Sequence, residues 1–480
     1  MTTDNHWKHL FAPESVALIG ASNTRGSWGH GIMRHLLASP KRKVYPVNPN
    51  ESEVLGIPAY DSVLNIPEAV DLAVIVVAAP RVPQIMQQCV QKGIKTAVIV
   101  SGGFAESGEP ELEAEVVKIA REGSIRFIGP NTMGHADTSS GLCTLAWTAQ
   151  IPPGPVALIS QSGNMMHRII HCGMSLGIGF SKFVSTGNEA DLHLEDYLEY
   201  MAGDEKTRVI TAYIEGLREG RRFLELARKI TPNKPIIAIK AGGTTESARA
   251  VRSHTAALAG SDAIYTAAFR QSGVIRVDDD DELCDVVTAL LYQPLPRSSR
   301  IGILTIGGGM GVVAAEAVER EGLEVAHLAP ATIEKLNTYL PPRWSHGNPV
   351  DMAGISMDEH HLAFSALWTL MEDKNVDAIL LQAPLGFSTE RLARTFTSEE
   401  IEAHHQREGN NLELLHQRVK ESGKPVFMVK PSVEFANDPE VSALFRKEEL
   451  PVYSAPRRAA KVLNHLVWYK RYLDALRENC

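Results

Sequence analysis

The sequence predicts an α/β protein built from three consecutive doubly wound parallel-sheet domains. Apolar runs of strand length alternate with amphipathic helical stretches along nearly the whole chain. The apolar runs are unbroken and rich in β-branched residues, which is typical of strands buried on both faces. At 480 residues the chain also exceeds what a single hydrophobic core accommodates. These observations favour parallel sheets covered by helices on both sides, repeated three times.

The first domain is expected at residues 8–135. Its strands are predicted at residues 15–20, 43–48, 72–77, 96–101 and 126–129. Residues 136–154 are predicted to be an irregular linker, because they end in Pro152, Pro153 and Gly154.

A glycine-rich turn runs from Gly20 to Gly29 and leads from the first strand into a helix. Glycines there let backbone N–H groups approach a phosphate, and a helix N-terminus favours negative charge. No acidic residue ends the second strand, which is preceded by Lys41–Lys43 and ends in Asn48. A basic group at this place suits a ligand with a ribose phosphate better than one with a free 2′-hydroxyl. A glycine turn without a ligand is the alternative.

The second domain is expected at residues 154–290, with strands at 156–159, 180–184, 209–214, 235–239 and 274–277. Ser160–Gly163 follow the first of these strands and open a helix, which makes them a nest of hydrogen-bond donors. Gly187–Asp191 and Glu215–Gly216 follow the next two strands. Ligands of open parallel sheets collect at the carboxyl ends of the strands, so these groups are expected to meet on one rim.

A loop from Lys240 to Gly260 follows the fourth strand and carries a single imidazole, that of His254. The loop opens with two glycines and small polar residues, which bury little apolar surface and favour mobility. Extended, about seven residues on either side of its apex span about 23–25 Å. A histidine can accept and return a group near neutral pH. The sequence therefore indicates a travelling nucleophile at His254; a structural histidine at a helix start is the alternative.

The third domain is expected at residues 300–470. Its strands are predicted at 301–305, 324–328, 378–382, 425–429 and 451–453, with an irregular loop at 344–351. The acidic run Asp278–Glu282 is interpreted as a first helical turn, where acids complement the helix dipole, and no metal site is predicted.

Composition excludes several classes of protein. A formal net charge of -9 argues against nucleic-acid binding. Five cysteines without close spacing fit a reducing compartment. The N-terminus lacks the apolar region of a signal peptide, and the longest apolar run, Leu72–Ala79, is far too short to cross a membrane. A cytoplasmic protein is expected.

Eight segments follow one another along the chain in a recognisable order: residues 11–22, 44–49, 129–131, 160–163, 187–191, 213–216, 252–255 and 348–351. In this order they resemble the NDP-forming acyl-CoA synthetases, which include the ADP-forming acetyl-CoA synthetases and the succinyl-CoA synthetases. The resemblance extends from about residue 8 to residue 470.

The resemblance implies a Rossmann-like CoA-binding domain followed by two flavodoxin-like domains. It implies that acyl-CoA and phosphate exchange to acyl phosphate and CoA, and that His254 then carries the phosphoryl group to ADP. Ser160, Gln161, Ser162 and Gly163 would hold the phosphate, and Glu215 would orient the imidazole. The implied CoA contacts are Gly20, Ala21, Ser22, Gly26, Ser27, Gly29, Lys43, Asn48, Pro80 and Asn131.

Thr132, Ile306 and Met310 depart from the residues usual in this family, so the carboxylic acid substrate stays open. The sequence also leaves open whether the nucleotide is ADP or GDP. Ala256 also stands where relatives usually have glycine, and it removes no reacting group. Trp28, Trp147 and the pair Met165–Met166 are candidates either for an acyl pocket or for core packing.

Members of this family also bind ATP or ADP with Mg²⁺ on an ATP-grasp domain. No such fourth domain is recognised after residue 470 of this sequence. The expectation is therefore an α subunit that works with a separate ATP-grasp β subunit, in an α2β2 assembly. Two alternatives remain. One is a catalytically silent protein of the same fold that senses CoA or acyl-CoA. The other, a nicotinamide-dependent dehydrogenase, is disfavoured because no acidic residue ends the second strand.

Overall fold

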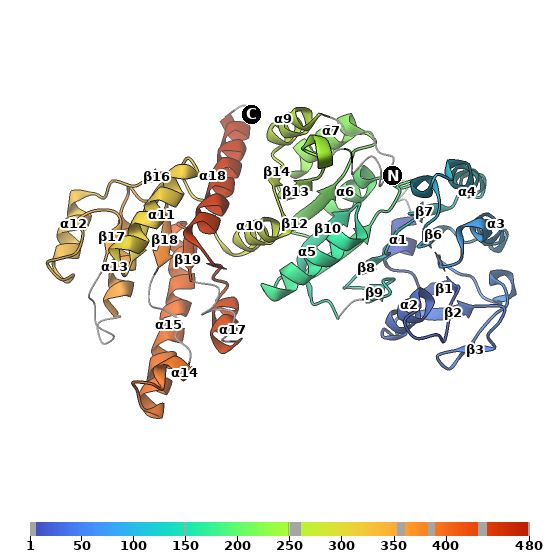
Figure 1. Cartoon of the computed structure of the whole chain (residues 1–480), viewed down its shortest axis with the longest axis horizontal. Coiled ribbons are helices and arrows are strands. Elements are labelled where there is room, and N and C mark those ends of the chain that lie inside the picture. The colour runs from blue at the N-terminus through green and yellow to red at the C-terminus, as the bar shows by residue number, and fades with distance from the viewer. Residues whose placement is uncertain are drawn as a thin grey trace. The chain divides into compact units, whose positions relative to one another are not determined.

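The computed structural model describes residues 6–147, 150–247, 249, 261–352, 361–382, 389–430 and 439–478. The chain divides into two compact units, Met1–Leu283 and Cys284–Cys480, and each is described by itself. Helices cover the sheets in both units, which Figure 1 colours from blue to red along the chain. This layering confirms the predicted α/β class.

The first sheet of the N-terminal unit is parallel throughout, in the order β2-β1-β5-β6-β7. All five strands lie where the sequence predicts them, because consecutive buried residues run through β1, β5 and β6 and through the last part of β2 and β7. Their bounds are β1 (Ser15–Ile19), β2 (Lys43–Val47), β5 (Leu72–Ile75), β6 (Thr96–Ile99) and β7 (Arg126–Ile128). The connecting helices are α2 (Trp28–Leu37), α3 (Val82–Lys92) and α4 (Pro110–Glu122). A small hairpin, β3 (Glu53–Val54) with β4 (Ile57–Pro58), follows β2.

The second sheet has the order β14-β13-β12-β10-β11-β8-β9. Its parallel strands are β10 (Pro153–Ser160), β11 (Phe180–Ser185), β12 (Val209–Ile214), β13 (Ile236–Lys240) and β14 (Ile275–Val277). The helices are α5 (Gly163–Ser175), α6 (Leu194–Ala202), α7 (Gly220–Ile230) and α9 (Asp262–Ser272).

The segment expected to be an irregular linker contributes two strands to this sheet. β8 (His135–Asp137) pairs antiparallel with β11, and β9 (Leu142–Cys143) pairs antiparallel with β8. The sheet is therefore mixed at this edge, and the prediction for residues 136–154 was wrong in that respect.

Both sheets of the N-terminal unit share a hydrophobic core. The short helix α1 (His6–Phe11) packs where they meet, with Trp7 stacked on Tyr200 at 4.5 Å between ring centroids. Nε2 of the buried His135 lies 2.7 Å from the carbonyl oxygen of Leu10. These contacts fix the two sheets against each other, so groups from both can form one site.

The C-terminal unit is built on a third parallel sheet, ordered β16-β15-β18-β19-β20, with β17 also pairing β15. β17 (Val350–Asp351) lies in the stretch expected to be irregular, so that expectation was incomplete. The other strands are β15 (Arg300–Thr305), β16 (Glu324–Val325), β18 (Ala378–Gln382), β19 (Val426–Val429) and β20 (Val452–Tyr453). The helices are α11 (Gly308–Arg320), α12 (Pro330–Asn337), α13 (His361–Glu372), α14 (Thr389–Leu392), α15 (Ser398–Ser422), α17 (Pro439–Lys447) and α18 (Pro456–Glu478).

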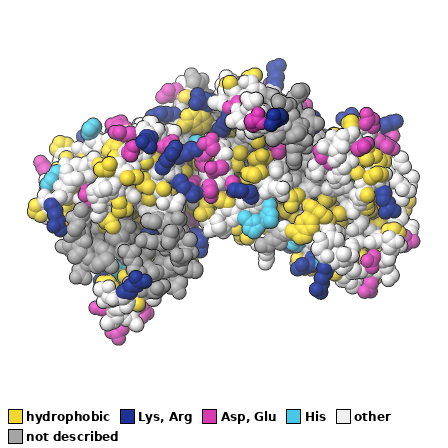
Figure 2. Space-filling view, in the orientation of Figure 1, with side chains coloured by type: hydrophobic (Ala, Val, Ile, Leu, Met, Phe, Trp, Pro, Cys, Tyr) yellow, Lys and Arg dark blue, Asp and Glu magenta, His cyan; other side chains and the backbone are white. Residues whose placement is uncertain are grey.

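The acidic run at 278–282 behaves as predicted. Helix α10 (Asp280–Tyr292) begins within it and carries three acidic residues in its first turn. Among the described residues there is no cluster of three or more metal-ligating side chains, and no helix is long and apolar enough to cross a membrane. Figure 2 shows hydrophobic and charged side chains interspersed over the visible described surface.

Candidate functional site

A cavity of 780 Å³ lies in the N-terminal unit, at the carboxyl ends of β5, β6 and β7 and at the start of α5. Strand ends of the first sheet and the N-terminus of α5 in the second sheet therefore line one cavity. Of the predicted ligand groups, Ser160–Gly163 contribute three residues to it and the Gly20–Gly29 turn contributes only Trp28, whereas Glu189 lines a different cavity. Its lining consists of Trp28, Val76, Val77, Val100, Ser101, Gly102, Asn131, Thr132, Met133, Trp147, Gln161, Ser162, Gly163, Asn164, His167 and Ser185.

In the Ser160–Gly163 turn, some groups hold the conformation of the turn and others are available to bind an anion. Ser160 is fully buried and donates to the carbonyl oxygen of Ser162 at 2.7 Å, so it shapes the turn. Ser162 caps α5 by accepting from the amide of Met165 at 3.3 Å. The amides of Gly163 and Asn164 precede the first intrahelical bond and are the donors an anion would use at this helix N-terminus.

The side chain of Gln161 holds the end of β12 rather than pointing at an anion. Its Oε1 accepts from the amides of Glu215 at 2.5 Å and Gly216 at 3.0 Å. Its Nε2 donates to the carbonyl oxygen of Gly216 at 2.7 Å. The structure therefore brings Glu215 and the anion nest together through Gln161.

Glu215 is 5% exposed at the end of β12. Nζ of the buried Lys240, at the end of β13, donates to the carbonyl oxygen of Glu215 at 3.0 Å and lies 4.3 Å from the ring centroid of Tyr265. Burial lowers the pKa of Lys240. Sequence reasoning missed this lysine, although its place at a strand end was a signal. His254 lies outside the described residues.

The glycine turn after β1 is tightly packed at two positions. A Cβ on Gly20 would meet the carbonyl oxygen of Val76 at 2.2 Å, and one on Gly29 would meet the carbonyl oxygen of Gly20 at 2.0 Å. Gly20 also has φ +96, and Gly26 has φ +85. Only glycine fits the crossing of the turn with the start of α2.

The remaining predicted CoA contacts of this region lie in two places. Ser27 caps α2, and Asn48 donates from Nδ2 to the carbonyl oxygen of Ala21 at 2.8 Å. Ser22 accepts from the amide of Thr24 at 3.0 Å. Lys43 stands at the opposite end of β2 from Asn48 and pairs with Glu68 at 2.6 Å. The structure thus groups Gly20, Ala21, Ser22, Ser27, Gly29 and Asn48, and does not bring Lys43 to them.

Two further predicted contacts follow strands of the first sheet. Pro80 lies in the 3-10 turn η2 (Ala79–Arg81) after β5. Asn131 follows β7 with φ +60 and lines the cavity. Its backbone N–H donates to the carbonyl oxygen of Ser101 at 2.8 Å.

Aromatic and sulfur-bearing side chains form the apolar part of the cavity wall. Trp28 and Trp147 meet edge to face at 4.2 Å between centroids, and both line the cavity. Met133 packs against Gly163 so closely that a Cβ there would meet its Sδ at 2.4 Å. Met166, by contrast, is fully buried core. Sequence reasoning missed Met133 and His167, whose signal was their nearness to a strand end and a helix start.

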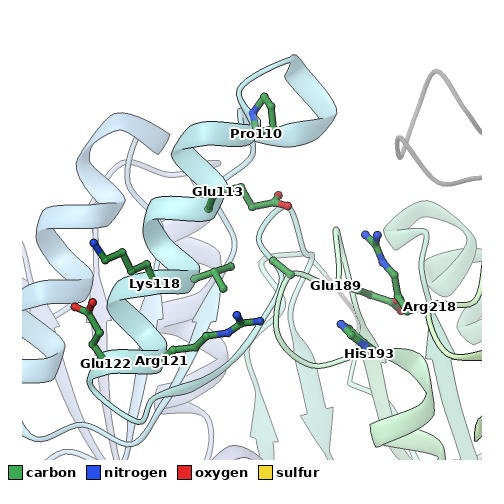
Figure 3. Close-up of a pocket in the computed structure, with 11 residues that line it drawn as sticks. Pro110, Glu113, Lys118, Arg121, Glu122, Glu189, His193 and Arg218 are labelled. Carbon is green, nitrogen blue, oxygen red and sulfur yellow. The ribbon is translucent and has the colours of Figure 1, made fainter.

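A second cavity, of 630 Å³, lies between α4 and the loop after β11. Figure 3 shows Arg121 and Glu113 on the α4 side and His193 and Arg218 on the opposite side, with the Glu189 carboxylate directed towards Arg218. Glu189 is 3% exposed, and burial raises the pKa of its carboxyl to about 8.

Family models match all three sheets. A CoA binding domain matches residues 14–137, a succinyl-CoA ligase like flavodoxin domain matches residues 153–290, and a ligase-CoA domain matches residues 301–389.

Two curated relatives and one solved structure are similar over long stretches. Acetate–CoA ligase [ADP-forming] II subunit alpha of Pyrococcus furiosus is 39% identical over 470 residues, which cover 96% of this chain and 97% of that protein. Acetate–CoA ligase [ADP-forming] of Methanocaldococcus jannaschii is 43% identical over 356 residues, 74% of this chain and 50% of that protein. Acetyl-coenzyme A synthetase 1 of Ca. Korarchaeum cryptofilum, solved with phosphate and ADP, has 32% identity and a TM-score of 0.83, covering 98% of each chain.

Proposed function

The chain belongs to the family of ADP-forming acyl-CoA ligases, which are acid–thiol ligases, and we propose that it is an α subunit that exchanges acyl groups between CoA and phosphate. The complete reaction interconverts a carboxylic acid, CoA and ATP with acyl-CoA, ADP and phosphate. The relative from Pyrococcus furiosus is itself a subunit alpha.

One observation carries this proposal: a single cavity joins the strand ends of the CoA-binding domain to the N-terminus of α5. Asn131 and Ser101 come from one side, and Ser162 and Gly163 from the other. A thioester entering along the first sheet would meet a phosphate held by amides at the helix start. Attack by a phosphate oxygen on the thioester carbonyl requires this juxtaposition.

In the proposed reaction, a phosphate oxygen bonds to the acyl carbon, the carbon–sulfur bond breaks, and the thiolate takes up a proton as CoA leaves. His254 then attacks the phosphorus of the acyl phosphate, releasing the carboxylate, and later gives the phosphoryl group to ADP. Glu215, which Gln161 holds beside the anion nest, orients the imidazole by accepting from one ring nitrogen. Positioning and charge neutralisation account for most phosphoryl-transfer catalysis.

We assign ADP and its Mg²⁺ mainly to an ATP-grasp β subunit, in an α2β2 assembly. The chain by itself would then exchange acyl groups but form no acyl-CoA from ATP. Co-expression with a candidate partner is expected to restore nucleotide-dependent synthesis. Synthesis of acyl-CoA from ATP by this chain alone would contradict the assignment.

The first half-reaction tests the proposal without a partner. Acetyl-CoA and phosphate are incubated with the chain, and acyl phosphate is trapped with hydroxylamine as the hydroxamate. A panel of longer acyl-CoA thioesters extends the assay, because the acyl group is open. Hydroxamate that requires both phosphate and enzyme is the expected result. CoA binding with no hydroxamate from any thioester, with or without a partner, would instead support a silent CoA-sensing protein.

A further inference from the structure

Asn188 lies where the first and second sheets of the N-terminal unit meet, and its side chain is hydrogen-bonded across that seam. Its Nδ2 donates to Glu106 at 2.5 Å and to Glu113 at 2.8 Å, while its Oδ1 accepts from Nδ2 of Asn131 at 3.3 Å. Its backbone amide donates to the carbonyl oxygen of Pro130 at 2.9 Å. The residue is only 8% exposed.

The partners of Asn188 lead directly to the wall of the 780 Å³ cavity. Asn131 lines that cavity itself. Glu106 accepts from the backbone amide of Gly103 at 2.6 Å. Ser101 and Gly102, which directly precede Gly103, also line the cavity. The loop after β6 and the loop after β7 are therefore both tied to one amide side chain of the second sheet.

Charge explains why an amide suits this position. Two carboxylates, those of Glu106 and Glu113, face Nδ2, and Figure 3 shows Glu113 on α4 directed towards the loop that carries Glu189. Burial acts to raise the pKa of Glu106, but hydrogen bonds from Asn188 and from backbone amides lower it below its ordinary value. Asparagine supplies two N–H donors and one acceptor without adding charge.

The other charged groups near the seam offer little compensation for an added negative charge. Nη2 of Arg218 donates to the backbone carbonyl oxygen of Asn188 at 3.0 Å. The neighbouring Glu189 is buried, and burial together with the charge of the buried Glu195 on α6 raises its pKa. A carboxylate at position 188 would face two others, with the guanidinium of Arg218 on its backbone carbonyl. The basic groups Lys118, Arg121 and His193 line the adjacent 630 Å³ cavity with Glu113, and none of them is hydrogen-bonded to Asn188.

We propose that Asn188 is a positioning residue for the acyl-transfer cavity, because its amide bridges Glu106 and Glu113 and so holds the Ser101–Gly102 and Asn131 walls against the start of α5. The identity of what binds in the cavity rests on the proposed function; the bridging contacts do not. Without the bridge, these walls are expected to shift and to weaken CoA binding, although Asn188 itself does not contact the ligand.

The test compares CoA affinity in Asn188→Asp, Asn188→Ala and wild type, each measured by calorimetric titration at pH 7.5 and pH 5.5. Asn188→Asp is expected to weaken binding about tenfold or more at pH 7.5, and Asn188→Ala only about threefold, because like charges sharing a site repel. Lowering the pH protonates the introduced carboxyl, whose pKa the two glutamates raise, so the loss relative to wild type is expected to shrink at pH 5.5.

Two further variants separate charge from shape. Glu113→Gln combined with Asn188→Asp removes one facing carboxylate and is expected to recover part of the loss. Glu122→Gln removes a carboxylate from the same helix and the same 630 Å³ cavity wall, and is expected to keep CoA affinity within about twofold. CoA affinity of Asn188→Asp within twofold of wild type, or a loss unchanged by pH and by Glu113→Gln, would overturn the proposal.

A wild-type chain without affinity for CoA would contradict the proposed function but not the bridging role of Asn188. That role is then tested by thermal unfolding. Asn188→Asp is expected to lower the midpoint at pH 7.5 and to regain it at pH 5.5. An unchanged midpoint at pH 7.5 would overturn the positioning role as well.

Discussion

At the scale of single side chains, the carboxyl of Glu189 is buried, and burial moves its pKa across neutral pH. Burial raises its pKa from 4.5 to about 8, so the folded protein holds it protonated at neutral pH. The unfolded chain ionises it above its ordinary pKa. The resulting contribution to stability is therefore complete below pH 4.5 and is lost as the pH rises towards 8.

Glu189→Gln keeps the shape and removes the titration. We expect the free energy of unfolding of the variant to exceed that of wild type by an amount that grows between pH 5 and pH 8, reaching roughly 1–3 kcal/mol. Denaturant titrations at several pH values measure this difference. A difference that stays constant with pH would show that the carboxyl is not held protonated.

Ser162 caps α5 and lines the cavity, so we propose that it both stabilises the helix and binds phosphate. Ser162→Ala is expected to lower the free energy of unfolding by about 1 kcal/mol, the usual cost of a lost N-cap. It should also raise KM for phosphate about tenfold, and more than KM for acyl-CoA, as an oxyanion donor is lost. Ser162→Thr restores a capping hydroxyl, so stability that fails to return in that variant would argue against the cap.

Residue types at strand ends could be predicted from the sequence, but the direction of each side chain could not. The Ser160–Gly163 turn was expected as a unit of phosphate donors, whereas Ser160 is buried and Gln161 points to Glu215 and Gly216. Hydrogen-bond direction depends on neighbouring strands that are remote in sequence. The same holds for Asn188, whose carboxylate partners lie 82 and 75 residues away.

The turn between β1 and α2 is the element most constrained by backbone crossing. Gly29→Ala would place a Cβ 2.0 Å from the carbonyl oxygen of Gly20, where neither backbone can yield easily. We expect it to cost about 2–4 kcal/mol of stability and to abolish measurable CoA binding. Gly26→Ala meets no atom within 4 Å and bears only the strain of φ +85, about 1–2 kcal/mol. Equal costs for the two variants, by chemical denaturation, would contradict this packing.

Strands that lie in apolar runs were predictable, including the two-residue strands β16 and β20, whereas β8, β9 and β17 were not. In the first sheet, β1, β5 and β6 consist almost wholly of apolar residues, so their pattern alone identifies them. β8 and β9 have only three and two residues, and β17 has two. Their hydrogen bonds come from a neighbouring strand, β11 or β15, which no local pattern reveals.

The whole molecule consists of two compact units, and the cavity proposed to bind CoA and phosphate belongs to the N-terminal one. CoA should therefore stabilise that unit alone. In differential scanning calorimetry, CoA at about 100 times its Kd is expected to add about 2.7 kcal/mol to the unfolding free energy of one transition. The second transition, that of the C-terminal unit, should stay in place. A shift of equal size in both transitions would contradict this division.

The phosphohistidine intermediate is tested most directly by following labelled phosphate onto the chain. Acetyl-CoA, or a longer acyl-CoA thioester, is incubated with ³²P-phosphate and the protein, and labelled peptides are mapped under alkaline conditions that preserve phosphohistidine. If His254 carries the phosphoryl group, label on His254 requires both thioester and phosphate, and it disappears in His254→Asn while CoA binding persists. Label that survives His254→Asn, or its absence with every thioester in the presence of a partner subunit, would contradict that role.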